Sequence, residues 1–397
     1  MKKETLRAFW FHRQGLDGSL DGAAPAAVLE RSGWARSVAG AGPYLTLHAR
    51  AGIGRERADR AVADLEIHEL PAARGCTYVV PAADFALALV LGQEGAKAPL
   101  RVAATLGVTA QEIDRLSDKV VDALAGGPLE PDAIKKAVGR ACRNLGEAGK
   151  KKGMTTTLPV ALGLLQSEGR IRRVPVNGRL DQQRYRYTLW NPSPLAHRAP
   201  APEEAATELA RRWFRWIGPA TLAEFRVFSA LGVSASQTAI ESLGLVPMES
   251  GSDRMLFPEE REALLQFKAP REPIYALVSG LDALALHRRD LASLVDDRDG
   301  RRRVMNDRSL TTLGGLKDLP SHAIVDRGRV VGLWEYDPES DGIAWASFGV
   351  DDAALREAVA RTERFVRDDL GDARSFSLDS PASRAPRIEA LRNAAAV

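Results

Sequence analysis

One pattern recurs three times along the 397-residue chain: an apolar-periodic helix, a short exit, and two strands joined by a turn. The pattern occupies residues 55–81, 156–190 and 234–258, and the residues in front of each copy can supply earlier helices. A helix pair followed by a β-hairpin is the element order of a winged helix-turn-helix. The repeat therefore predicts an α+β chain with about three tandem winged helix-turn-helix units.

The hairpin of the second copy, IRRVPVNGRLDQQRYRYTLW (171–190), is unusually rich in arginine. Asn177 and Gly178 favour a two-residue type I′ turn, which would place Arg173 opposite Gln182. Side chains alternate along a strand, so the arginines 184 and 186 would share one face with Arg173. The tyrosines 185 and 187 would then point to the other face and pack on the helices. This pattern predicts a wing with one basic face.

Positive charge is concentrated around this hairpin. Residues 133–186 contain thirteen basic and three acidic residues, a net charge of +10, whereas the whole chain carries only +3. A block of one sign usually faces a polyanion, although a solvated surface is the alternative. We expect phosphate contacts from this block, including the threonines at the start of its last helix, where Thr157 is predicted to be the cap. The expected contact residues are Lys135, Lys136, Arg140, Arg143, Lys150, Lys151, Lys152, Thr155, Thr156, Thr157, Arg172, Arg173, Arg179, Arg184 and Arg186.

The pattern changes after about residue 269, where β-rich segments with turns at 326–328 and 341–342 precede a helix at 352–370. The last fifteen or so residues are expected to be only partly ordered. The predicted domains are winged helix one at 1–95, winged helix two with the basic wing at 96–192, winged helix three at 200–268, and a C-terminal β-rich domain with a terminal helix at 269–397. A Pro-rich linker at 191–204 separates the second from the third.

Six runs together resemble the bacterial winged-helix DNA-binding family that includes the AlkZ/YcaQ-like DNA glycosylases. They are PYLTLHAR (43–50), RGCTYVVPAAD (74–84), GRIRRVPVNGRLDQQRYRY (169–187), GPATLAEFRVFSALG (218–232), LVSGLDALALHRRDL (277–291) and LPSHAIVDRGRVVGLWEYD (319–337). The resemblance implies tandem winged helices curved into a DNA-sized channel and a C-terminal β-barrel-like domain that closes one side. Some members of the family excise bulky alkylated bases or unhook crosslinks.

The chain departs from that family where the resemblance places its chemistry. Catalytic members carry a Gln-x-Gln or Gln-x-Asp pair about a dozen residues before the arginine that corresponds to Arg50. Here Arg36 and Val38 stand nearest those positions, and no carboxylate lies between Arg31 and Arg55. A valine cannot position or deprotonate water, and acid–base catalysis contributes roughly 10²- to 10⁴-fold in rate. The catalytic residues are therefore unassigned, and the sequence leaves open whether the chain is an enzyme.

Asp282 is the best remaining polar candidate, since the resembling family has an aspartate at this place in its β-domain. It could supply a carboxylate, but structural pairing with Arg288 or Arg289 is the expectation. The tryptophans 10, 213, 216, 334 and 345 could include a wedge residue, and the sequence does not choose among them. The GIGRERA run (52–58) predicts a helix-to-helix turn instead of a dinucleotide site.

The expected function is duplex DNA binding in DNA repair or genome protection, mainly through phosphates. The alternatives are a glycosylase for bulky alkylated or crosslinked bases with a divergent site, and a transcriptional regulator. The six scattered histidines and two cysteines predict neither a metal nor a cofactor. The expected partner is double-stranded DNA, damaged DNA included. We expect a monomer, because three winged helices in one chain can span a DNA-sized groove without two-fold symmetry. The resemblance implies a bacterial protein, and the sequence predicts a cytoplasmic one, since it shows no signal peptide and no membrane-length apolar run.

Overall fold

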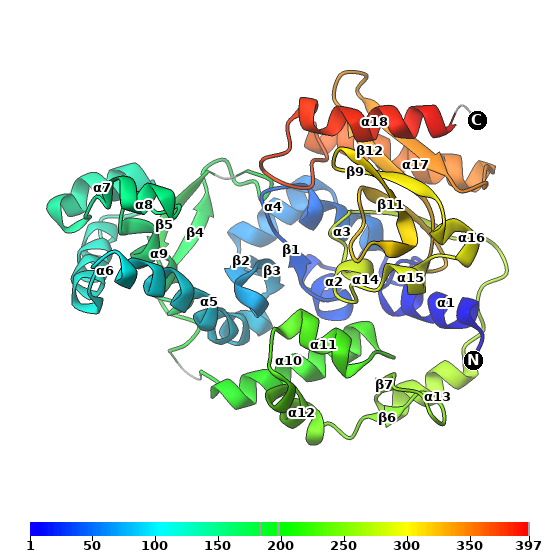
Figure 1. The fold of residues 1–397 in the computed structure, drawn as a ribbon, viewed down its shortest axis with the longest axis horizontal. Coiled ribbons are helices and arrows are strands. Elements are labelled where there is room, and N and C mark those ends of the chain that lie inside the picture. The colour runs from blue at the N-terminus through cyan, green and yellow to red at the C-terminus, as the bar shows by residue number, and fades with distance from the viewer. Residues whose placement is uncertain (183, 197–198, 396–397) are drawn as a thin grey trace.

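The three repeated segments all form the same succession of elements. A computed structural model describes residues 1–182, 184–196 and 199–395 (Figure 1). The first unit, residues 25–81, consists of α2 (Pro25–Ser32), β1 (Ala35–Arg36), α3 (Gly42–Ala51), α4 (Arg55–Ala63), β2 (Ile67–Pro71) and β3 (Thr77–Pro81). Its sheet has the order β1-β3-β2. The predicted helix-to-helix turn at 52–54 lies between α3 and α4.

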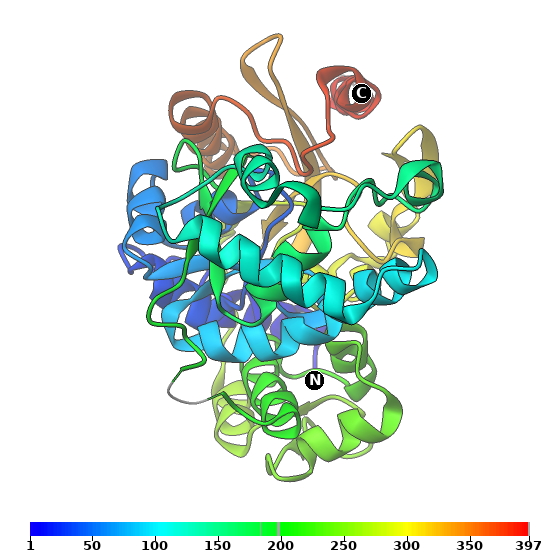
Figure 2. The ribbon, with the colours of Figure 1, turned by 90° about the vertical axis from the view of Figure 1, so that its left-hand side faces the viewer.

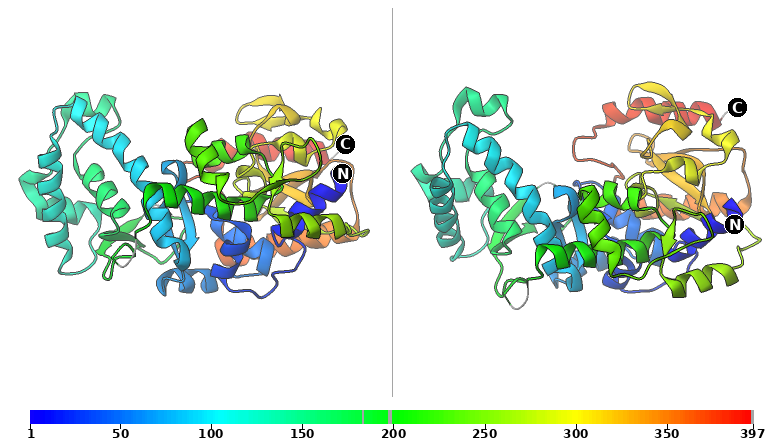
Figure 3. Two further views of the ribbon diagram at one scale, coloured as in Figure 1. Left: turned by 90° about the horizontal axis from the view of Figure 1, so that it is seen from below. Right: turned by 60° about the horizontal axis from the view of Figure 1, so that its bottom comes forward.

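The second unit, residues 110–189, follows this order with one additional short helix. It stands apart from the rest of the molecule in Figures 1 and 3 and lies in front of it in Figure 2. It consists of α6 (Ala110–Leu124), α7 (Pro131–Val138), α8 (Gly146–Lys151), α9 (Leu158–Ser167), β4 (Ile171–Pro175) and β5 (Tyr185–Leu189). A bridge between Leu129 and Tyr187 stands where β1 stands in the first unit. The capping box of Thr109 and Glu112 fixes the start of α6.

The third unit, residues 202–256, follows the same plan. It consists of α10 (Pro202–Ile217), α11 (Leu222–Ser229), α12 (Val233–Glu241), β6 (Val246–Pro247) and β7 (Met255–Leu256). A bridge between Ala220 and Met255 again precedes the helix pair. Thr221 and Glu224 form a capping box at the start of α11, as expected of Thr221 from the sequence. Residues 197–198 of the predicted linker lie outside the described residues.

The C-terminal part contains an open sheet of four antiparallel strands in the order β13-β12-β11-β8, so the expected barrel-like closure is wrong. Its strands are β8 (Tyr275–Val278), β11 (His322–Asp326), β12 (Arg329–Asp337) and β13 (Gly342–Ser347). The edge strands β8 and β13 do not pair with each other, because helices pack where closure would bring them together. α17 (Ala353–Phe365) contacts β8 and β13, and α18 (Pro381–Ala395) contacts β12 and β13. Both predicted turns, at 326–328 and 341–342, join strands of this sheet.

Smaller elements complete the C-terminal part and its link to the third unit. They are α13 (Pro258–Gln266), α14 (Ala283–Leu286), α15 (Leu291–Leu294), α16 (Asp297–Gly300), and the hairpin of β9 (Arg303–Asn306) and β10 (Ser309–Thr312). α18 corrects the expectation of a partly ordered terminus. Its residues Arg384, Arg387, Ile388 and Leu391 are buried, because they face the sheet at helical spacing.

Two features cross the predicted domain boundaries. α1 (Lys3–Arg13) packs with the C-terminal part, since Trp10 and Phe11 share a core with Leu333 and Leu391. α5 (Phe85–Thr105) is one helix through the predicted boundary at residue 95. Its first half packs in the core of the first and third units, and its second half packs in the core of the second unit. The second unit is thus joined to the rest by a continuous helix.

Candidate nucleic-acid interface

The end of α7 and the segment around α8 present an exposed basic surface on the second unit. Ile134 and Val138 face the core, so Lys135 and Lys136 point outward from α7. Arg140 follows the helix, and Lys151 ends α8. These four basic side chains are exposed, and none forms an ion pair within the part of the chain that the structure describes. They are free to meet an anion.

Three further basic residues of the expected set are exposed but engaged. Arg143 pairs with Glu112 at 3.2 Å, and Lys150 pairs with Glu147 at 2.6 Å. The ammonium of Lys152 donates to the hydroxyl of Thr105 at 2.5 Å. Exposed pairs of this kind contribute about 0 to 1 kcal/mol, so a phosphate can displace them.

The three threonines at the start of α9 differ in accessibility. Thr155 is exposed, Thr156 is half-buried, and Thr157 is buried. The hydroxyl of Thr157 accepts a hydrogen bond from the amide of Arg143 at 3.0 Å and does not cap α9. The predicted cap is therefore wrong, because this hydroxyl ties α9 to the preceding loop. Thr155, Thr156 and Lys135 border a groove of about 350 Å³ beside α9.

The outward surface of α9 is almost free of hydrogen-bonding side chains. Pro159 is exposed, Gly163 and Leu164 are half-buried, and the polar Gln166 and Ser167 are buried. The amide of Gln166 donates to the carbonyl of Leu162 inside the same helix. A helix that reads base edges needs side-chain donors and acceptors on its exposed face. α9 offers a smooth surface to a duplex instead.

The register of the basic hairpin differs from the expected one. Arg173 lies opposite Tyr187, and Val174 lies opposite Arg186. The strands end at Pro175 and begin again at Tyr185, so nine residues connect them in place of the predicted two-residue turn. Arg173 therefore shares a face with the tyrosines, and its guanidinium lies over the ring of Tyr185 at 5.1 Å. The expected face that includes Arg173 does not form, and Arg172 and Arg186 lie together on the face opposite the tyrosines instead.

The connecting loop is anchored to the body of the molecule. Leu180 is fully buried in the core shared by the first unit and the C-terminal part, and its amide donates to the hydroxyl of Tyr44 at 2.9 Å. Arg179 pairs with Asp181 through two hydrogen bonds and donates to the carbonyl of Leu370 at 2.8 Å. Arg179 is therefore occupied within the protein. The tip of the hairpin docks the second unit onto the body.

The other expected arginines of the hairpin lie in different settings. Arg172 and Arg186 are half-buried without an ion pair among the described residues, and Arg184 is exposed with its guanidinium 3.7 Å from Glu130. Arg173 points inward, with its guanidinium 3.9 Å from the carboxylate of Glu69 on β2. Arg172, Arg184 and Arg186 can still reach an anion outside the protein.

The segment that corresponds to the family's glutamine pair lies on and beside β1. The guanidinium of Arg36 donates to the carbonyl of Thr77 at 2.7 Å and lies over the ring of Tyr78 at 5.4 Å. Val38 is half-buried and has no group that could orient water. Neither side chain can act as a base.

A carboxylate nevertheless lies across the sheet from this segment. Glu69 accepts hydrogen bonds from the hydroxyl of Ser37 at 2.5 Å and from the hydroxyl of Tyr185 at 3.4 Å. Burial, and then the nearby Glu69, raises the pKa of Tyr185, so the phenol keeps its proton and donates. The second carboxylate oxygen of Glu69 is buried and has no hydrogen-bond partner among the described residues. No motif in the sequence marks this cluster.

Asp282 forms a fully buried ion pair with Arg50 of α3. The carboxylate of Asp282 accepts two hydrogen bonds from the guanidinium of Arg50, at 2.7 and 2.9 Å. The same guanidinium donates a third hydrogen bond to the side-chain oxygen of Gln14 at 2.9 Å. Both side chains of the pair are 0% exposed. The expected partners Arg288 and Arg289 are therefore wrong, because Arg289 pairs with Asp318 at 2.6 Å and Arg288 lies 3.9 Å from Glu224. This pair joins the first unit to the C-terminal part.

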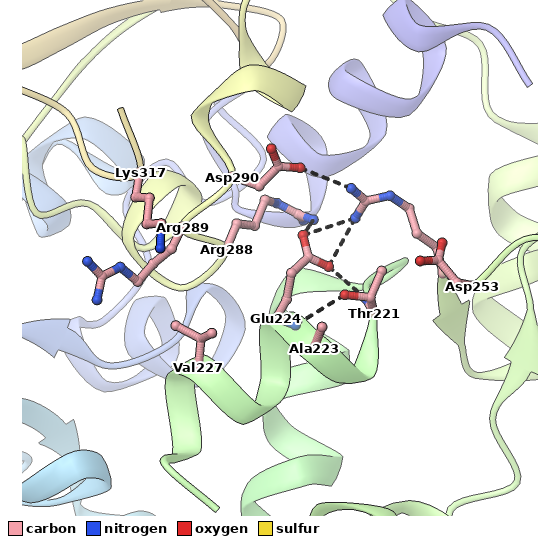
Figure 4. A pocket seen from close by; sticks show the side chains of 10 residues that line it. Thr221, Ala223, Glu224, Val227, Asp253, Arg288, Arg289, Asp290 and Lys317 are labelled. Carbon is pink, nitrogen blue, oxygen red and sulfur yellow. Dashed lines mark hydrogen bonds and ion pairs between the residues drawn. The ribbon is translucent and has the colours of Figure 1, made fainter. Parts of the chain in front are cut away.

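Arg288 instead lines a charged pocket of about 450 Å³ between the third unit and the C-terminal part (Figure 4). Burial lowers its pKa to about 9, and its guanidinium lies 3.6 Å from the centroid of the Trp10 ring. Arg254 bridges Glu224 at 3.1 Å and Asp290 at 3.2 Å, whereas Lys317 points away from this network (Figure 4). The charges at the centre of the pocket compensate one another and fasten the two parts together.

Most of the tryptophans considered as wedge residues are buried. Trp10, Trp213, Trp216 and Trp334 are buried, and Trp345 is half-buried. Within residues 1–182, 184–196 and 199–395, no group of three potential metal ligands occurs. No helix in the same residues is long and apolar enough to cross a membrane.

Comparison with known proteins gives two matches of different kinds. A family model described as DNA glycosylase AlkZ-like matches residues 39–365. The solved structure of the Streptomyces sahachiroi DNA glycosylase AlkZ has a similar fold, with a TM-score of 0.68 at 19% sequence identity. That match covers 95% of this chain and 98% of the other. No curated protein matches the sequence.

Proposed function

The chain belongs to the DNA glycosylase AlkZ-like family, and from that premise we propose that it binds duplex DNA, damaged DNA included, in DNA repair. The observation that carries the proposal is the exposed surface of Lys135, Lys136, Arg140 and Lys151, whose charges are not paired within the described residues. Unpaired lysines and arginines on one surface bind phosphates and release counterions. Arg172, Arg184 and Arg186 extend this surface along the hairpin.

We further propose that the three repeated units are winged helices and that one chain acts as a monomer. The support for winged helices is their shared order of helix, strand or bridge, helices and hairpin, with two helices before the hairpin in the first and third units and the short α8 added in the second. In this proposal each unit is the centre of a larger domain. The second domain spans residues 96–192 and the third spans 200–268, as predicted from the sequence. The first domain spans residues 25–95, and α1 belongs to the C-terminal part, since Trp10 and Phe11 pack in its core.

A salt series tests DNA binding. Fluorescence anisotropy of a labelled duplex should give a log–log dependence of affinity on salt with a slope of several units. The variant Lys135→Ala/Lys136→Ala/Arg140→Ala should lower that slope by roughly two to three, since each phosphate contact contributes about 0.9 to it.

The matched control is Arg356→Ala/Arg361→Ala/Arg364→Ala, which removes three exposed positive charges from α17. It changes the net charge equally and should leave the slope within about one unit of the wild type. If the two variants lost the same amount of slope, the effect would come from net charge and not from this surface. A wild type that does not bind at low salt would overturn the proposal.

A second candidate function is base excision with Glu69 as the relocated carboxylate. The observation that favours it is the Glu69 oxygen that has no hydrogen bond among the described residues and lies 3.9 Å from Arg173; the other oxygen is held by Ser37, in the segment of the family's glutamine pair. Cleavage of a glycosidic bond passes through a positively charged sugar, which a carboxylate stabilises while it orients water. Abasic-site formation on alkylated duplex DNA should then fall by roughly 10²-fold or more in Glu69→Gln, with DNA affinity unchanged. Equal activity of Glu69→Gln and wild type would remove Glu69 from the chemistry.

A further inference from the structure

The loop between α17 and α18 holds two large apolar side chains in solvent. Leu378 is 90% exposed, which is more than any other large apolar residue described. Phe376 is 47% exposed. The loop lies on the side of the C-terminal part that faces the second unit (Figures 1 and 3). A leucine that stays in solvent gains little from folding, and two apolar side chains close together on the surface can mark an interaction site.

The backbone of the loop is firmly held. The amide of Ala41 donates to the carbonyl of Arg374 at 2.8 Å, and the amide of Ser377 donates to the carbonyl of Val38 at 3.1 Å. Gly40 allows this approach, because a Cβ there would lie 2.2 Å from the carbonyl oxygen of Ser375. The exposure of the two apolar side chains is therefore built into the loop.

A tight turn presents the two side chains at the tip. The amide of Asp379 donates to the carbonyl of Phe376 at 3.0 Å, and the Asp379 carboxylate accepts from the amide of Phe376 at 2.9 Å. These two bonds close a four-residue turn around Leu378. A turn closed in this way loses little conformational freedom when its tip enters a ligand.

Basic side chains flank the loop on both sides. Arg374 lines a cavity of about 230 Å³ with Arg179. On the other side, Arg308 of the β9–β10 turn lines a cavity of about 490 Å³ with Asp379. Arg308 is exposed and forms no ion pair within the described residues, whereas the guanidinium of the half-buried Arg374 donates to the carbonyl of Asp181 at 3.0 Å. An apolar tip beside an exposed arginine suits a ligand with stacked rings and an anionic backbone.

We propose that Phe376 and Leu378 form a wedge that enters the base stack of a duplex held between the second unit and the C-terminal part. This proposal rests on the proposed DNA binding. Apolar side chains inserted at a base step unstack it and bend the duplex. The exposed Arg308 is placed to meet a phosphate beside the opened step.

The test is a short duplex with 2-aminopurine at its central steps, whose fluorescence rises when the base is unstacked. Wild-type protein should raise this fluorescence on binding. Phe376→Ser/Leu378→Ser should abolish the rise and lose about ten-fold in affinity, with the salt slope unchanged. The conservative variant Phe376→Leu/Leu378→Met should keep the rise.

Leu265→Ser is the matched control, since Leu265 is 65% exposed on α13, outside the loop and the second unit. It should behave as the wild type does. An unchanged fluorescence rise in Phe376→Ser/Leu378→Ser, together with salt-dependent binding, would overturn the wedge and leave DNA binding standing. Absence of binding by the wild type would overturn both proposals.

Discussion

Asp282 illustrates, at the scale of single residues, how the environment decides the role of a carboxylate. The sequence offers it as a chemical candidate, but its two oxygens are held by Arg50, and neither side chain reaches solvent. Removing one charge from a buried pair strands the other, which costs about 3 to 5 kcal/mol. We expect Asp282→Asn to lower the free energy of unfolding by that amount, measured by urea denaturation.

Asp297→Asn is the matched control for Asp282→Asn. The side chain of Asp297 is 93% exposed and should tolerate the same change with a loss below about 0.5 kcal/mol. Equal stability of the two variants would mean that the buried pair contributes nothing specific to the fold.

The buried His68 should make the free energy of unfolding depend on pH in the acid range. It is buried beside Phe85 and Trp190, and burial, aided by the charges of Arg172 and Arg173, lowers its pKa to about 3. The unfolded chain therefore takes up a proton at this residue near its ordinary pKa of about 6.5, and the folded chain does not. The free energy of unfolding should fall as pH drops from about 6.5 toward 3, by about 2 to 3 kcal/mol between pH 7 and 4.5.

His68→Phe removes this group and keeps a ring in the site. Urea denaturation at the two pH values should show a smaller acid loss for His68→Phe than for the wild type. The same loss in both proteins would mean that other groups cause the acid sensitivity.

Glu69 shows why part of the site could not be predicted from the sequence. The sequence around Arg36 and Val38 offers no carboxylate, since none lies between residues 31 and 55. Glu69 reaches Ser37 across the sheet, from a strand whose register only the fold supplies. The basic residues of α7 and α8 were predictable, because charge density is a local property of the chain.

At the scale of elements, the repeated helices and hairpins follow from local periodicity, whereas the hairpin register does not. Asn177 and Gly178 are a strong turn signal, yet the strands pair farther along because Leu180 enters a core outside its own unit. A leucine between arginine and aspartate in a polar loop was the available hint. α18 was missed for a related reason, since it buries two arginines among its apolar contacts.

The buried tip of the hairpin gives a prediction at this scale. Leu180→Ala should destabilise the protein by about 2 to 5 kcal/mol, because a buried leucine leaves a cavity. Amide exchange of residues 176–182 should accelerate more than that of α9, since the loss is at the docking point. Leu378→Ala, at a leucine that is 90% exposed, should leave both quantities nearly unchanged. If amide exchange accelerated equally along the whole chain, the hairpin tip would not be a separate anchor.

At the scale of the whole molecule, the open sheet and the position of α1 could not be predicted from the sequence. Strand patterns predict that a sheet forms, but whether it closes depends on what packs at its edges. α1 and α18 lie at opposite ends of the chain and share one core. No local signal connects residues so far apart.

The smooth surface of α9 predicts how the whole molecule discriminates among duplexes. With Pro159 and Gly163 outward and no donor on that face, binding should depend on phosphates and shape. Competition among unrelated undamaged duplexes of one length should give affinities within about ten-fold, whereas sequence-specific proteins discriminate by roughly 10³-fold or more. A larger preference for one sequence would favour a transcriptional regulator.

The second unit is attached twice, through the continuous helix α5 and through the hairpin tip at Leu180. Two attachments remove the hinge that a single linker would leave. Association with DNA should therefore proceed in one kinetic phase, without a slower closing step, at a rate set by encounter and accelerated by the positive charge. The speed of capture would then be governed by ionic strength and by the concentration of duplex.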